Sequence, residues 1–126
     1  MRYLRVTLLG NVWSLACLVG GCGPSGEELY RKLQDKDPSV RIAAAVRAAE
    51  LKDEKAVPHL VERLSDGEDD VRFFAYIALR KITGQTMGYR YYDPPQPRAE
   101  AIRRWREWMK QRHLSPPTTR PEGGGA

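Results

Sequence analysis

The 126-residue chain has little of what builds disulfide frameworks, metal centres or membrane-spanning helices. Its two cysteines, Cys17 and Cys22, both lie near the amino terminus, so they cannot cross-link the rest of the chain. Its two histidines, His59 and His113, are far apart and lack ligand-like neighbours, so we expect no metal and no cofactor. The apolar run at residues 6–19 is shorter than the roughly 20 residues that span a bilayer as a helix.

Groups that carry catalysis are equally scarce. The chain has no glycine-rich phosphate loop and no cluster of histidines with carboxylates, and His59 with Glu62 forms only one pair at helical spacing. We therefore expect that the protein is not an enzyme. Charged residues make up 29% and aromatic residues 9%, which is typical of one small, soluble helical domain.

The amino terminus has the organisation of an export signal. Arg2 and Arg5 precede the apolar run at residues 6–19, and the run ends in the sequence LVGGC at residues 18–22. This order resembles the lipobox of bacterial lipoproteins, which implies a signal peptide at residues 1–21 and acylation of Cys22. Residues 22–26 would then form a short tether, and two or more acyl chains would hold the protein stably at a membrane.

Other interpretations of this terminus are a conventionally cleaved signal, the start of a buried helix, or acylation of Cys17 after a shorter apolar run. The lipobox resemblance implies a bacterial membrane lipoprotein that faces the periplasm or the outside. Because Gly23 is not the aspartate that marks inner-membrane retention, the outer membrane is favoured. Export argues against nucleic acid as a partner.

Two units repeat at a shift of 31 residues. Six identities share one ungapped register: Leu29 with Leu60, Leu33 with Leu64, Asp35 with Asp66, Val40 with Val71, Arg41 with Arg72, and Ala44 with Ala75. Apolar periodicity predicts a helix, a turn and a second helix in each unit. The residues expected to face the core of the long helices are Val40, Ala43, Ala44, Ala48 and Leu51, then Val71, Phe74, Ala75, Ala78, Leu79 and Ile82.

The sequences DPSVR at residues 37–41 and DDVR at residues 69–72, each followed by an alanine-rich helix, resemble the HEAT-like repeats of phycobilisome lyases. The resemblance covers residues 27–83 and implies an all-α fold, a short HEAT-like α-solenoid of antiparallel helix pairs. It also implies that Arg41 and Arg72 make structural contacts with turn carboxylates such as Asp35 and Asp66, in preference to binding a ligand. An enzyme related to the lyases is supported only by this scaffold.

The repeat domain is expected to span residues 27–113 and to end in a loop at residues 84–97 and a capping helix at residues 98–112. Such a helix would cover the last apolar face of the stack. Trp105 and Trp108 are three residues apart, so one of them is expected at the edge of the core. Residues 114–126 are rich in proline, threonine and glycine, which predicts a disordered tail.

Two groups of residues are candidates for binding. Tyr89, Tyr91 and Tyr92 have the composition of a protein-binding hot spot, although they could instead pack the loop onto the last helix. Arg103, Arg104, Arg106 and Lys110 could bind anionic lipid headgroups or another polyanion, although a solvated helix face explains them too.

We therefore expect a non-catalytic, membrane-anchored adaptor or scaffold that binds another protein of the bacterial envelope. Solenoids usually need about three repeats to bury a continuous core. With only two repeats in the chain, a partner or a homodimer is expected to supply the missing buried surface.

Overall fold

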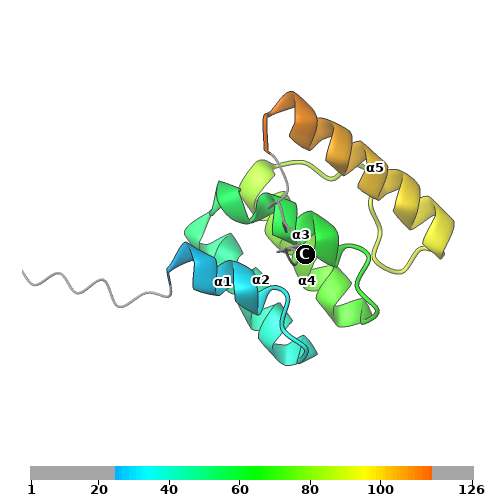
Figure 1. The fold of residues 1–126 in the computed structure, drawn as a ribbon. Coiled ribbons are helices and arrows are strands. Elements are labelled where there is room, and N and C mark those ends of the chain that lie inside the picture. The colour runs from blue at the N-terminus through cyan, green and yellow to red at the C-terminus, as the bar shows by residue number, and fades with distance from the viewer. Residues whose placement is uncertain (1–24, 115–126) are drawn as a thin grey trace, which may run out of the picture.

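A computed structural model describes residues 25–114, and this part of the chain is built from helices without strands. Its elements are α1 (Gly26–Lys32), α2 (Pro38–Leu51), a 3₁₀ turn η1 (Glu54–Ala56), α3 (Val57–Arg63), α4 (Asp69–Thr83) and α5 (Pro95–Gln111). Figure 1 shows them in chain order. The expected signal peptide, Cys22 and residues 115–126 lie outside the described residues.

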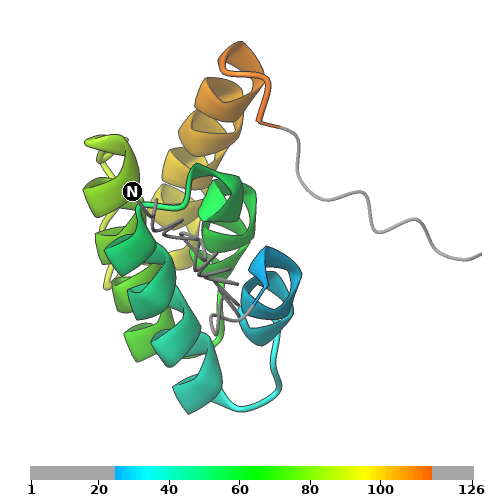
Figure 2. The ribbon, with the colours of Figure 1, turned by 90° about the vertical axis from the view of Figure 1, so that its left-hand side faces the viewer.

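The helices form two layers closed at one end. Figure 2 shows α2 and α4 side by side in one layer and α1 and α3 in the other. The most extensive helix contact joins α2 to α4, and α5 lies across the end of the stack against α3. The predicted all-α, short helical solenoid is thereby confirmed. None of the described helices is long and apolar enough to cross a membrane.

The helix ends follow the capping residues in the sequence. Asp37 accepts a hydrogen bond from the Ser39 backbone N–H at 2.8 Å, and Pro38 occupies the first turn, where its missing N–H has no cost. Gly84 ends α4 with a φ of 72°, a left-handed conformation that glycine adopts without strain. The capping helix begins at Pro95, three residues earlier than expected, because a first turn tolerates prolines.

The core runs through both repeats to the last helix. Its largest fully buried side chains include Leu33, Leu60, Leu79 and Trp105, each with an exposed fraction of 0%. Trp108 lies at the edge and is half-buried, as its spacing from Trp105 requires.

Two predictions about the core face of the first long helix are wrong. Ala43 is exposed because it lies at the open end of the stack, where none of the helices in residues 25–114 covers it. Leu51 is 51% exposed because it is the last residue of α2, at the end of the helix.

Candidate functional site

The first motif arginine holds the turns of the two repeats together. Arg41 donates to the carboxylate of Asp66 at 2.8 Å and to the backbone oxygens of Asp35 and Lys36 at 2.7 and 3.0 Å. The carboxylate of Asp35 has a different role, since it accepts the backbone N–H of Asp37 at 2.9 Å. Arg41 is only 9% exposed, so its guanidinium is committed to these contacts.

The second motif arginine repeats this arrangement in the turn between α3 and α4. Arg72 donates to the backbone oxygens of Asp66 and Gly67 at 2.8 and 3.2 Å and pairs with the carboxylate of Asp69. Its Nε also donates to the backbone oxygen of Tyr91 at 3.1 Å, which fixes the loop before α5. At 7% exposure, Arg72 is part of the scaffold.

The three loop tyrosines differ in exposure, and for Tyr89 the structure shows the packing alternative. Tyr89 is 2% exposed, and its hydroxyl donates to the backbone oxygen of Leu64 at 2.6 Å, so it packs inside and cannot reach a partner. Tyr91 is half-buried against Phe73, with ring centroids 5.1 Å apart. Only Tyr92, at 65% exposure, is freely accessible.

An exposed apolar surface lies where the sequence analysis did not place one. Within residues 25–114, the large hydrophobic side chains that remain exposed are Val46, Leu51, Phe73, Ile77 and Tyr92. Most of them belong to one surface, which we call the α2–α4 face and define by Ile42, Val46, Phe73, Ile77, Tyr91 and Tyr92.

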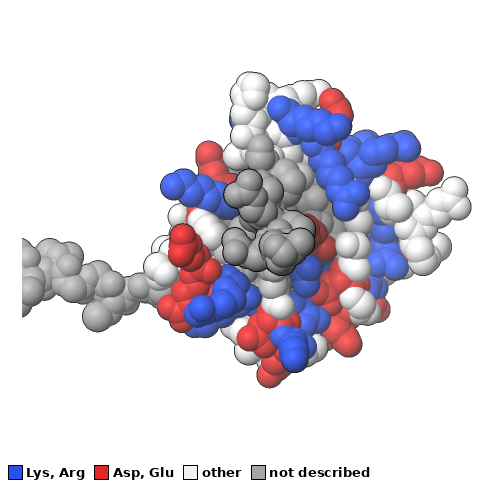
Figure 3. Space-filling view, viewed as in Figure 1, with Lys and Arg blue, Asp and Glu red and all other residues white. Residues whose placement is uncertain are grey.

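The repeat itself contains the signal for this face. At the shift of 31 residues, Ile42 corresponds to Phe73 and Val46 to Ile77, so both long helices carry apolar residues at the same outward positions. In contrast, Figure 3 shows the opposite side of the molecule, with α1 and α3 toward the viewer, where charged side chains of both signs lie among uncharged ones.

The basic residues of α5 divide into two sets. Arg104 turns to the preceding loop, where its Nε donates to the backbone oxygen of Met87 at 2.9 Å. Arg103, Arg106 and Lys110 are exposed, and Arg106 and Lys110 border a hollow of about 300 Å³ between α3 and α5. Glu107 lies 3.7 Å from Lys110 and reduces the positive charge of this row.

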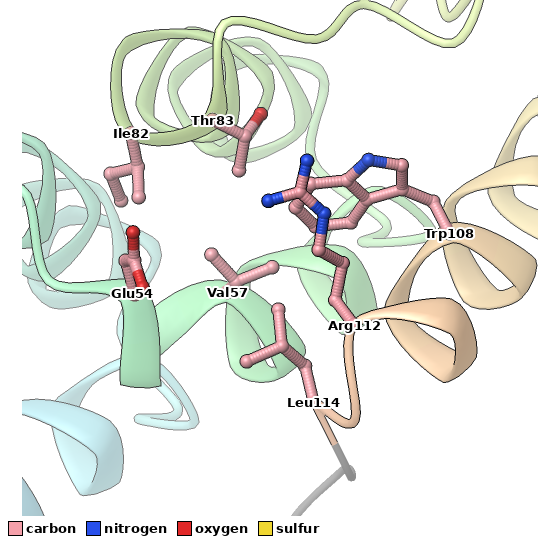
Figure 4. Close-up of a pocket in the computed structure, with 7 residues that line it drawn as sticks. All are labelled: Glu54, Val57, Ile82, Thr83, Trp108, Arg112 and Leu114. Atoms are coloured by element: carbon pink, nitrogen blue, oxygen red, sulfur yellow. The ribbon is translucent and has the colours of Figure 1, made fainter.

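A second hollow, of about 310 Å³, lies where α3, α4 and α5 meet (Figure 4). Arg112 lies over the ring of Trp108, 5.0 Å from its centroid. The hydroxyl of Thr83 already donates to the backbone oxygen of Leu79 at 2.7 Å, and Glu54 is the one carboxylate that lines the hollow. The hollow thus offers no nucleophile paired with a base.

His59 of α3 joins the second repeat to α1 of the first repeat. Its ring stacks on Tyr30 with centroids 4.7 Å apart, and Gln34 Nε2 lies 3.4 Å from its Nδ1. Burial lowers the pKa of His59, against the opposing influence of Glu62. Burial, together with a 2.9 Å hydrogen bond to Asp53, raises the pKa of Tyr30 to about 12.

The contacts of His59 and Tyr30 hold α1 and α3 together. Among the described residues no group of three or more His, Cys, Asp or Glu side chains could hold a metal ion.

Two layers of paired helices with buried turn arginines define an α-solenoid module. Residues 25–86 match the family model of HEAT repeats, which supports a HEAT-repeat domain in this part of the chain. HEAT repeats generally mediate protein–protein interactions. No curated protein and no solved structure gave a significant match.

Proposed function

We propose that the protein is a non-catalytic adaptor, anchored to a bacterial membrane through a lipid on Cys22, that binds another envelope protein on its α2–α4 face. The likeness of its turn sequences to lyase-type HEAT repeats concerns the scaffold, so it adds no catalytic role. The observation that carries the binding role is the exposure of Phe73 and Ile77, each 36% accessible, beside Val46 at 38%.

At matching outward positions of two repeats, Val46, Phe73 and Ile77 leave more than a third of their surface exposed although they are apolar. Burial of apolar area contributes roughly 25 cal/mol per Å², so covering these side chains with a partner stabilises a complex. Tyr92 adds an accessible aromatic ring at one end of the face, beside Tyr91 at a ring distance of 5.2 Å.

The test uses a photo-crosslinking amino acid placed at Ile77 in the full chain, expressed in intact bacterial cells. We expect a discrete crosslinked product that disappears when Phe73→Ser is added, because that change removes apolar area next to the probe. The same probe at Glu107, exposed on α5, is the matched control and should give no such product. A product that survives Phe73→Ser, or that forms equally at Glu107, would refute binding on the α2–α4 face.

The anchor is tested separately by intact mass and membrane fractionation of the full chain and of Cys22→Ala. Wild-type protein should lose residues 1–21, gain lipid mass and sediment with membranes, whereas the variant should do none of these. Outer-membrane placement predicts that the wild type separates with the denser membrane fraction. A wild type that stays unmodified would rule out this anchor while leaving the crosslinking result independent.

The basic row of α5 supports a second candidate function, the binding of anionic lipid headgroups. Arg103, Arg106 and Lys110 are exposed on one helix, and Figure 3 shows basic side chains gathered over α5. Binding of the protein to vesicles that contain phosphatidylglycerol should then weaken in Arg106→Glu and at raised salt. Equal binding to neutral vesicles would exclude this role.

A further inference from the structure

The first repeat leaves a groove open at the end of the stack. This groove, between α1 and α2, has a volume of about 400 Å³. Leu29 and Lys32 line it from α1, and Val40, Ala43 and Arg47 line it from α2. It lies on a different side of α2 from the α2–α4 face.

The second repeat shows how this chain fills such a groove. The positions that match Val40, Ala43 and Arg47 at the shift of 31 residues are Val71, Phe74 and Ala78. Val71 and Ala78 are 0% and 1% exposed, because α2 packs against α4 over them. In the first repeat Val40 is only partly buried, and Ala43 and Arg47 are exposed. The open groove is thus the surface that a long, alanine-rich helix covers one repeat later.

The opposite end of the stack is closed. There, Tyr89 packs against Tyr76 of α4, with ring centroids 5.7 Å apart, and Trp105 of α5 is fully buried. A second copy therefore finds no open helix pair at this end, which prevents head-to-tail addition of copies. Two copies can pair through their open ends only with the same surface on each, as in a two-fold dimer.

The charges around the groove suit such a pairing. Lys32 pairs with Glu28 at 2.9 Å, and Arg47 pairs with Glu50 at 3.1 Å, all with exposed side chains. A surface that carries charges of both signs is complementary to a second copy of itself, since the basic side chains of one protomer can pair with the carboxylates of the other. The small side chain of Ala43 between them allows two helices to approach closely.

We propose that a second copy of this chain covers the groove, so that the α2 helices of two protomers pack against each other across a two-fold axis near Ala43. The dimer extends the stack from two repeats to four and supplies the neighbour that the first repeat lacks. The proposal does not depend on the α2–α4 face.

The experiment places a cysteine at Ala43 in the full chain and follows disulfide formation in intact cells on non-reducing gels. We expect a crosslinked dimer well above the wild-type background, because residues near a two-fold axis meet their own copies. Ser65→Cys, at an exposed turn position and with the same native cysteines, should remain at that background. Equal crosslinking in both variants would overturn the proposal.

Light scattering of the purified, detergent-solubilised chain provides the second measurement. Wild-type protein should have twice the monomer mass. Ala43→Arg should halve this mass while circular dichroism stays unchanged, since Ala43 is exposed. Val46→Arg, which lies on the α2–α4 face of the same helix, should remain dimeric. A monomeric wild type, or a dimer that tolerates Ala43→Arg, contradicts the proposed interface.

Discussion

Removal of the Asp66 carboxylate should destabilise the domain more than any change at an exposed ion pair. Asp66 accepts Arg41 at 2.8 Å, Arg63 at 3.3 Å and the backbone N–H of Glu68 at 3.1 Å, and its side chain is 4% exposed. In Asp66→Ala, Arg41 keeps its two backbone acceptors but loses its only carboxylate. Its Nε already has no hydrogen-bond partner, so a buried cation is left poorly compensated.

Breaking a buried pair in this way costs about 3–5 kcal/mol. A domain of this size has a total stability of roughly 5–13 kcal/mol, at about 0.05–0.15 kcal/mol per residue. With a urea dependence near 1–1.5 kcal/mol per molar, the unfolding midpoint should fall by about 2–5 M. Circular dichroism during urea titration measures this shift.

The matched control is Glu50→Ala, which removes the carboxylate of the exposed Arg47–Glu50 pair and should cost less than about 1 kcal/mol. In a double-mutant cycle, Arg41→Met should restore part of the stability of Asp66→Ala, because it removes the uncompensated charge. Equal midpoints for Asp66→Ala and Glu50→Ala, or strict additivity with Arg41→Met, would refute the structural role assigned to this arginine.

Three further predictions concern the core. The free energy of unfolding should fall as pH drops below about 6.5, because burial lowers the pKa of His59 in the folded state. The stability that neutral His59 contributes is fully present above its pKa in the unfolded chain, and it is lost as the pH falls toward its lower pKa in the folded state. Urea titrations at pH 7.5 and pH 5 should show a decrease that is smaller in His59→Phe. Tyr89→Phe should cost about 1–3 kcal/mol in the same assay, since it leaves the backbone oxygen of Leu64 without its 2.6 Å donor; an unchanged midpoint would contradict this. Trp105→Ala should cost about 3–5 kcal/mol and Trp108→Ala clearly less, because only Trp105 is fully buried; equal losses would argue against α5 as a cap.

The fold could be predicted because its determinants are local or repeated. The spacing of leucines and alanines indicated the helices, and Asp37 with Pro38 and Gly84 indicated where α2 begins and α4 ends. What could not be predicted depends on neighbours far away in sequence. Ala43 has the helical spacing of a core residue, yet it is exposed because no helix of the described part of the chain lies against it.

The candidate site was harder to predict, because composition does not report exposure. The three loop tyrosines look alike in sequence, but Tyr89 is buried and donates a hydrogen bond to the backbone oxygen of Leu64, whereas Tyr92 is exposed to solvent. The apolar residues of the α2–α4 face were not predicted as a site, because hydrophobic residues on a helix are expected to be buried. Phe73 and Ile77 are hydrophobic residues of α4, a helix that has neighbours on two sides. Only the orientation of this helix in the folded stack distinguishes its outward-facing hydrophobic residues from its buried ones.

The two proposed surfaces and the proposed anchor are compatible in space. In a two-fold dimer through the open grooves, both α1 helices lie beside the interface, and each starts at Gly26, four residues after Cys22. A tether of that length spans at most about 14 Å, which would hold the α1 ends of both copies close to one membrane. The two α2–α4 faces remain free, so a partner with two binding sites would gain avidity without any new contact. Ala43→Arg should then weaken partner binding although Ala43 lies outside the α2–α4 face.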